Sequence, residues 1–205
     1  MSRARRIARR HSNRPLAVRI VVATEGVLTE PEYLKLFSRF HGHHGVRVES
    51  IGVGGDPRAV VERAIEESKK LKNDRLARRD SVWAMFDRDI HARFDEAINL
   101  AHGNNIRLAI SNPCFELWGI LHYQEQHAPL NRHECQRKLG ELCPDFNAGA
   151  GKVFNDWNAV EQHYSAAVER AEIAAQRREE EGTPGGNPTT TVYILTEFIR
   201  CVGNG

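Results

Sequence analysis

The chain has 205 residues, of which 40% are hydrophobic and 27% are charged, and its formal net charge is +2. A chain of this size and composition can bury the core of one soluble globular domain, and no apolar run approaches the length needed to cross a bilayer. With no secretory leader pattern and no paired cysteine spacing, we expect a cytoplasmic protein with reduced thiols.

The first 15 residues carry positive charge and no acidic residue. Six arginines lie in this segment: Arg3, Arg5, Arg6, Arg9, Arg10 and Arg14. Without these six charges the net charge of +2 becomes −4, so the chain combines a basic arm with a mildly acidic body. Two interpretations of this arm stay open. It is either a disordered, solubilising tail or a segment that binds the phosphates of a nucleic acid.

Strand and helix patterns alternate from residue 16 to residue 125. Short β-branched runs predict buried strands, and apolar residues repeated at i, i+3, i+4 and i+7 predict helices with one inward face. The expected strands are 17–23, 46–53, 81–86 and 106–110, and the expected helices are 29–40, 57–71, 94–102 and 113–123. This alternation predicts an α/β fold: a parallel sheet of about four strands, with right-handed crossovers and helices on both faces.

The pattern changes after residue 124. Residues 124–154 are polar and contain several turn signals, which predict a helical insert whose bounds the pattern does not define. We expect a long helix from about residue 155 to 181 and a last helix from about residue 190 to 202. The predicted organisation is an arm over 1–15, an α/β core over 16–125, and a helical insert with C-terminal helices over 126–205 that pack on this core.

Three carboxylates are predicted to meet at one edge of the sheet. Glu25 directly follows the first strand, and Asp87 and Asp89 directly follow the third. Ligands of open α/β folds bind beyond the carboxyl ends of the strands, and residues i and i+2 of extended chain point to the same side. Carboxylates this close repel one another unless a hard cation holds them, so the pattern predicts an Mg²⁺ or Mn²⁺ site for a phosphodiester. The alternative is that these acids cap helices or lie in a solvated turn.

Three further residues are candidates for the same site. Glu116 lies in the first turn of the fourth predicted helix, where it can complete the coordination, act as a general base, or only interact with the helix dipole. Lys152 follows two glycines and can stabilise charge on a phosphate, although a surface lysine is the alternative. Arg88, between the two aspartates, is a candidate for phosphate contact.

Five sequence blocks together resemble the RloB-like proteins. The blocks are Val22–Tyr33, Gly54–Pro57, Phe86–Asp89, Ser111–Trp118 and Asn187–Val192. The resemblance spans nearly the whole chain and rests on the order of the blocks. It implies a Toprim-like domain in which Glu25 is the Toprim glutamate and Asp87 and Asp89 are the Toprim aspartate pair. No third acid follows Asp89 in that loop, which weakens the case for a second metal.

The resemblance also implies a function in bacterial anti-phage defence. The expected activity is that of a metal-dependent Toprim-type endonuclease on DNA or RNA, with tRNA among the candidate substrates, and the expected partner is an ATPase encoded nearby. An oligomer is allowed. The expected catalytic residues are Glu25, Asp87, Asp89, Glu116 and Lys152. The four carboxylates among them are the expected metal ligands, and the arm arginines and Arg88 the expected nucleic-acid contacts.

Two other functions stay open. One is a non-catalytic subunit that binds or senses nucleic acid and keeps the Toprim-like core. The other is a phosphohydrolase that acts on a small nucleotide at the same metal site.

Overall fold

The fold is seen in a computed structural model, which describes residues 18–41, 46–72, 80–88, 93–143, 146, 154 and 157–202. The strands are β1 (Val18–Thr24), β2 (Val46–Gly52), β3 (Ser81–Asp87), β4 (Arg107–Asn112) and β5 (Thr189–Thr190). The helices are α1 (Thr29–His41), α2 (Pro57–Lys72), α3 (Phe94–Gly103), α4 (Glu116–Tyr123), α5 (Arg132–Leu142), α6 (Trp157–Gln162), α7 (Tyr164–Glu180) and α8 (Val192–Val202). None of the helices in these residues is long and apolar enough to span a membrane.

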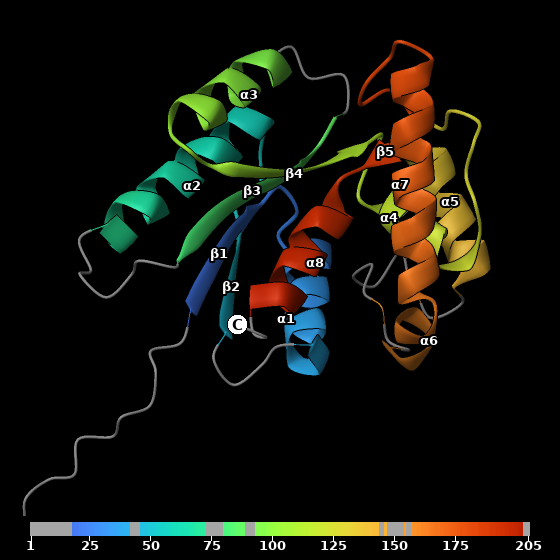
Figure 1. Cartoon of the computed structure of the whole chain (residues 1–205), viewed down its shortest axis with the longest axis horizontal. Helices are drawn as coiled ribbons and strands as arrows, with labels where there is room; N and C mark the ends of the chain where they lie inside the picture. Colours follow the sequence, from blue (N-terminus) through green and yellow to red (C-terminus); the bar gives the residue numbers. More distant parts are fainter. Residues whose placement is uncertain are drawn as a thin grey trace, which may run out of the picture.

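The strands form one sheet in the order β2-β1-β3-β4-β5 (Figure 1). The first four strands are parallel, and β5 is antiparallel to β4, with Thr190 opposite Ser111. The predicted α/β class is confirmed, and the architecture is consistent with the Toprim-like description. The antiparallel edge strand β5 was not predicted, because a strand of two residues has no periodicity to detect.

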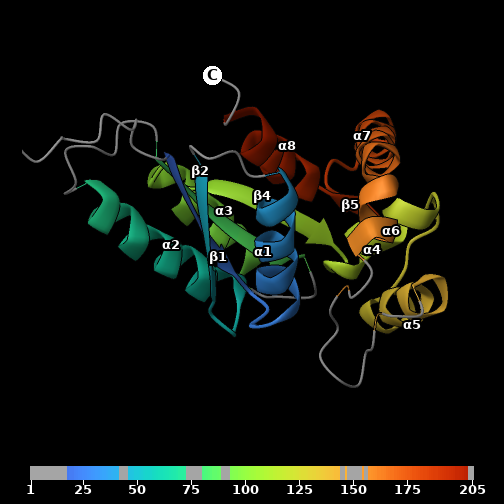
Figure 2. The ribbon, with the colours of Figure 1, turned by 90° about the horizontal axis from the view of Figure 1, so that it is seen from below.

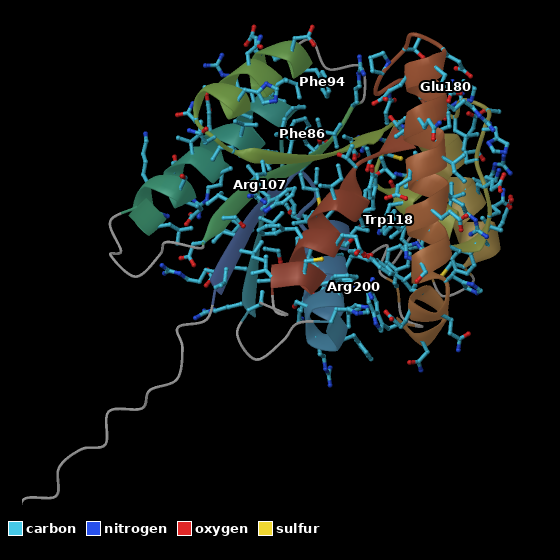
Figure 3. The ribbon with its side chains drawn as sticks, viewed as in Figure 1. Phe86, Phe94, Arg107, Trp118, Glu180 and Arg200 are labelled. Carbon is cyan, nitrogen blue, oxygen red and sulfur yellow. The ribbon has the colours of Figure 1, made fainter. Side chains whose placement is uncertain are left out.

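Helices cover both faces of the sheet (Figure 1, Figure 2). Side chains of a strand alternate between faces, so Val21 and Ala23 of β1 pack toward α2 and α3, whereas Ile20 and Val22 pack toward α1 and α8. On the α3 side, Phe86 of β3 meets Phe94 edge to face, with 6.0 Å between ring centroids (Figure 3). Each face of the sheet therefore has its own apolar core.

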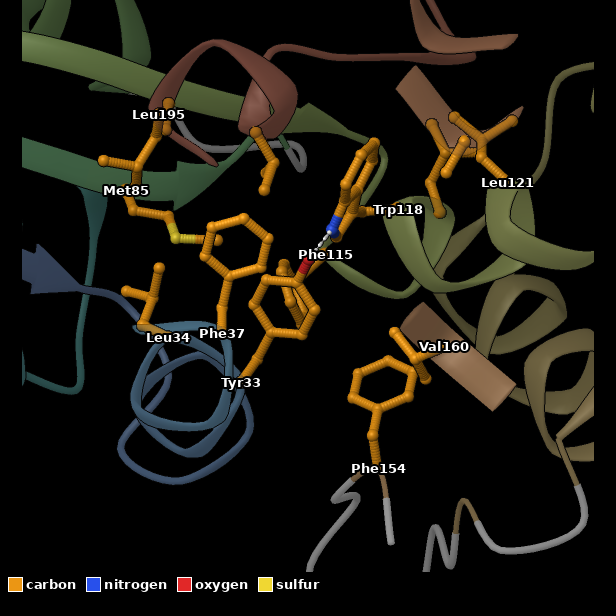
Figure 4. Close-up of a cluster of buried hydrophobic side chains, with 14 of the residues drawn as sticks. Tyr33, Leu34, Phe37, Met85, Phe115, Trp118, Leu121, Phe154, Val160 and Leu195 are labelled. Atoms are coloured by element: carbon orange, nitrogen blue, oxygen red, sulfur yellow. Dashed lines mark hydrogen bonds between the residues drawn. The ribbon is translucent and has the colours of Figure 1, made fainter. Parts of the chain in front are cut away.

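The helices α4, α5 and α7 gather beyond the β4–β5 side of the sheet (Figure 1). A buried hydrogen bond of 2.7 Å from Trp118 Nε1 to the Tyr33 hydroxyl joins α4 to α1 (Figure 4). The Tyr33 ring also packs against Phe115, Phe154 and Trp157. These aromatic contacts fix the first turn of α4 relative to the first turn of α1, and both turns carry acidic residues.

Three predicted helix bounds were wrong. The helix expected from residue 113 begins at Glu116, because Ser111 and Asn112 pair with β5 and keep the chain extended. The helix expected over 155–181 is divided at His163 into α6 and α7. The helix expected from residue 190 begins at Val192, since Thr189 and Thr190 belong to β5.

Candidate active site

The ends of two neighbouring strands place Glu25 beside Asp87. β1 and β3 are adjacent and parallel, with Thr24 opposite Met85, and the Glu25 N–H donates to the Met85 carbonyl at 2.9 Å. The Asp87 N–H in turn donates to Glu25 Oε2 at 3.0 Å. The two carboxylates are nearly buried, with 13% of the Glu25 side chain and 8% of the Asp87 side chain exposed.

The glycine block after β2 supports this arrangement. The Gly54 N–H donates to the Glu25 carbonyl at 3.1 Å, and the Val53 N–H donates to the Thr24 carbonyl at 2.9 Å. Gly54 has a φ of +66°, a conformation that residues with a Cβ rarely adopt. The block Gly54–Pro57 of the family resemblance thus turns the chain away from the sheet at the level of Glu25.

Two more acids join the pair from the first turns of helices. Glu30 in α1 is 5% exposed and Glu116 in α4 is 6% exposed. The Gly26 N–H donates to Glu30 Oε1 at 3.0 Å, and a Cβ on residue 26 would lie 1.9 Å from Glu30 Oε2. A side chain at residue 26 would therefore displace the Glu30 carboxylate from this position.

One guanidinium faces these acids. Arg132, the first residue of α5, donates from Nη2 to Asp87 Oδ2 at 3.0 Å and lies 3.6 Å from Glu25 Oε1. About a third of its side chain, 34%, is exposed. Arg132 belongs to the segment 124–154, for which the sequence pattern predicted a helical insert without defined bounds. This insert therefore supplies the guanidinium that faces the acids.

The four acids and Arg132 line a single cavity of about 300 Å³. Its wall also includes the backbone turn at Gly54 and Gly55, and Gln136 one turn after Arg132. Counted over the described lining residues, four carboxylates and one guanidinium give a formal excess of three negative charges. We call these five side chains the acid cluster: Glu25, Glu30, Asp87, Glu116 and Arg132.

The crowding of acids changes their proton affinity. Burial raises the pKa of Asp87 well above its ordinary value, the charges of Glu25 and Glu30 raise it further, and Arg132 only partly opposes this shift. Burial also raises the pKa of Glu30, while its backbone hydrogen bonds, including the one from Gly26, act in the opposite direction. Both acids therefore bind a proton more readily in the folded protein than they would in water.

The residue types fit a hard divalent cation. Carboxylate oxygens are the ligands that Mg²⁺ and Mn²⁺ prefer, and a cation in the cavity would balance the excess negative charge. Within the described part of the chain, no three His, Cys, Asp or Glu side chains are spaced for direct metal coordination. Instead, the Arg132 guanidinium contacts Asp87 and Glu25. Asp89, the third acid of the predicted triad, lies outside the described residues.

The other predicted site residues divide into two groups. Arg88 donates from Nη1 to the Gly185 carbonyl at 2.9 Å and lies over the Phe94 ring at 5.0 Å, and it does not line the cavity. Lys152 and the arm arginines lie outside the described residues. These residues are Arg3, Arg5, Arg6, Arg9, Arg10 and Arg14.

Sequence reasoning missed two members of the acid cluster. Glu30 stood inside a block of the resemblance but was not singled out, and Gly26, four residues before it, was the signal for its close approach. Arg132 had a signal as well. Asn131 and Glu134 form a capping box, a pattern that marks the start of a helix at residue 132.

The comparison with known families agrees with the resemblance. The sequence model of the family described as "RloB-like protein" matches residues 20–199. No curated protein and no solved structure gives a significant match. Because the match covers most of the chain, this protein belongs to the RloB-like family.

Proposed function

We propose that this protein is a divalent-metal-dependent nuclease of the Toprim type, which hydrolyses phosphodiester bonds of DNA or RNA. The acid cluster supports this proposal most directly. Four carboxylates, from the residue after β1, the last residue of β3 and the first turns of α1 and α4, line one cavity together with the Arg132 guanidinium. When bound there, Mg²⁺ or Mn²⁺ would supply an activated water and neutralise charge on the phosphate.

Each acid has a proposed role in this chemistry. Glu25 and Asp87 would hold the cation, because their carboxylates meet at the carboxyl edge of two adjacent strands. Asp89 is proposed as a further ligand on the strength of the family resemblance. Glu116 lies at the same cavity, where it either completes the coordination or accepts a proton from the attacking water. Lys152 is proposed to stabilise charge on the scissile phosphate.

The biological setting is proposed from the resemblance. An RloB-like nuclease would act in anti-phage defence together with a partner ATPase, and the arginines of the arm and Arg88 would contact nucleic acid. The cavity does not distinguish DNA from RNA, so both polymers belong in the first assays.

Metal binding is the first test of the proposed function. We expect Mn²⁺ to bind the wild-type protein in isothermal titration calorimetry. Glu25→Gln and Asp87→Asn should each weaken binding by more than the roughly 10–100-fold that loss of an outer partner costs. Glu96→Gln is the matched control, because Glu96 is an exposed acid of α3 that pairs with Arg58, away from the cavity.

Cleavage is the second test. The Mn²⁺-loaded wild-type protein, with its encoded neighbour where one exists, should cut single-stranded or double-stranded DNA or RNA, and Asp87→Asn should abolish the cleavage. Absence of both Mn²⁺ binding and cleavage in the wild type would refute the proposal. A non-catalytic binding subunit gives a different result. Deletion of residues 1–14 would then abolish nucleic-acid binding, whereas Glu25→Gln would leave it unchanged.

A further inference from the structure

Two polar devices place the start of α5 beside the acid cluster. The first is the capping box, in which the Glu134 N–H donates to Asn131 Oδ1 at 3.0 Å and the Asn131 N–H donates to Glu134 Oε2 at 2.7 Å. The second involves Asn187, whose side chain accepts from the Leu130 N–H at 3.1 Å and donates to the Leu130 carbonyl at 2.6 Å. We call this second pair of bonds the Asn187 clasp.

The two devices hold the backbone on the amino-terminal side of Arg132. Leu130 and Asn131 are the two residues that precede Arg132, so both are fixed before α5 begins. The clasp reaches across 57 positions of sequence, from the loop before β5 to the insert. A side chain whose backbone is fixed in this way loses less entropy when it binds a ligand, which is the basis of preorganisation.

Arg132 is a positively charged side chain in a cavity that is lined by acids. Its guanidinium contacts Asp87 and Glu25, and among the described residues that line the cavity it is the one Lys or Arg side chain. A phosphodiester that enters a cavity with four carboxylates is repelled unless positive charge meets it. The planar guanidinium, with its fork of N–H donors, is suited to phosphate oxygens as well as to carboxylates.

We infer that Arg132 is the phosphate-binding residue of this cavity, preorganised by the capping box and the Asn187 clasp. The inference rests on the proposed function and assigns the residue that receives the substrate phosphate there. It also gives Arg132 an opposite effect on cations, because its positive charge disfavours a metal ion at Glu25 and Asp87. One residue should therefore raise the affinity for phosphate and lower the affinity for the cation.

The test measures both affinities on one variant. In Arg132→Gln, the affinity for Mn²⁺ in isothermal titration calorimetry should rise by roughly three- to tenfold, because a positive charge close to the ligands is gone. The affinity for a fluorescein-labelled oligonucleotide in Ca²⁺, measured by fluorescence anisotropy, should fall by about tenfold. The slope of log affinity for the oligonucleotide against log salt concentration should decrease by the amount that about one phosphate contact contributes.

The matched control is Arg137→Gln, which removes the same charge from the same helix. Arg137 is exposed and pairs with Glu141 at 2.7 Å, and it does not line the cavity, so both affinities should stay at the wild-type level. Arg132→Lys keeps the charge but not the fork, and it should restore most of the salt dependence and part of the affinity.

Two results would overturn the inference about Arg132. If Mn²⁺ and oligonucleotide affinities fall together in Arg132→Gln, the residue has only a structural role. If neither affinity changes while the wild type binds Mn²⁺, Arg132 does not contact phosphate, although the proposed function stands. Failure of the wild type to bind Mn²⁺ would instead count against the proposed function.

Discussion

The two ends of β3 each present an acid with little exposure, but the two acids have different surroundings. Asp80, directly before the strand, is 6% exposed in its side chain and accepts from the Arg19 N–H at 2.8 Å and from Arg19 Nε at 2.7 Å. Asp87, the last residue of the strand, is 8% exposed and meets Arg132 together with three other acids. Among the described residues, Asp80 accepts two hydrogen bonds from Arg19, whereas Asp87 lies in a cavity that four carboxylates and the Arg132 guanidinium line.

Under the proposed function, this difference would separate an acid that stabilises the fold from an acid that binds a ligand. Removal of a charge from water is costly unless the protein supplies partners for it. Asp80 has such partners in Arg19, and its geometry is explained by the stability of the fold. The pKa of Asp87 is raised by burial and by neighbouring acids, and Arg132 opposes this shift only in part. A cluster of acids like this is typical of a cation-binding site. Such a site lowers the free energy of unfolding when its ligand is absent.

The largest expected effect is a difference in the free energy of unfolding between substitutions at the two ends of β3. Asp80→Asn removes the charge that accepts from Arg19, and we expect it to lower the free energy of unfolding by about 1.5–3 kcal/mol. Asp87→Asn keeps an oxygen that can accept from Arg132 but removes one negative charge from the acid cluster. It should leave the metal-free protein as stable as the wild type, or more stable.

Chemical denaturation in urea with EDTA measures this contrast. Addition of Mn²⁺ should stabilise the wild type and Asp80→Asn but not Asp87→Asn, since only the last variant lacks a proposed ligand. Equal destabilisation by the two substitutions would show that Asp80 and Asp87 both stabilise the fold, and the proposed difference between their roles would be wrong.

The sequence was sufficient to predict where Glu25 and Asp87 lie in the fold. Each acid follows from a local pattern, a short apolar run that ends in an acidic residue or directly before one, and parallel strands carry their carboxyl ends to one edge. The structure places β1 and β3 side by side, as the prediction required. Whether these residues bind metal and catalyse hydrolysis stays a prediction.

The remaining members of the acid cluster depend on tertiary structure. Glu30 and Glu32 both lie in the first turn of α1 and differ by about 200° around the helix axis, and the packing of α1 decides which one turns inward. Glu30 is buried, whereas Glu32 pairs with Lys35 on the surface. Arg132 is harder still to predict, because the segment before it is placed by the Asn187 clasp from a distant part of the chain.

A smaller effect is expected at the Asp87 end of β3 when the Asn187 clasp is removed. Asn187→Ala removes both bonds of the clasp, and we expect a loss of about 1–2 kcal/mol in the free energy of unfolding. Because Arg132 would then be less well positioned, oligonucleotide affinity in Ca²⁺ should fall in the same direction as in Arg132→Gln. The affinity for Mn²⁺ should change less than in that variant, since the charge of the guanidinium is retained.

The control for the clasp is Asn99→Ala, an exposed position in α3 that should leave stability and both affinities unchanged. If Asn187→Ala lowers stability but leaves oligonucleotide affinity at the wild-type level, the clasp is structural and does not position Arg132. The comparison would then rest on Arg132 alone.

The smallest expected effect is a pH dependence of stability that comes from the Asp87 end of β3. The pKa of Asp87 is raised by burial and by the charges of Glu25, Glu30 and Glu116, against the opposite effect of Arg132. The folded protein therefore binds a proton at Asp87 in a pH range where the unfolded chain has lost it. The free energy of unfolding falls as pH rises from about 4, the ordinary value, through the raised pKa, with a slope of at most about 1.4 kcal/mol per pH unit.

Subtraction of the Asp87→Asn curve from the wild-type curve isolates this contribution, in urea titrations with EDTA at a series of pH values. Burial lowers the pKa of His122 to about 4, which acts in the opposite direction because the unfolded chain then binds the extra proton. That contribution is common to both proteins and cancels in the difference. A difference curve that is flat, or that rises with pH, would mean that the charge of Asp87 is already compensated in the folded protein, and the electrostatic argument for the Asp87 end of β3 would fail.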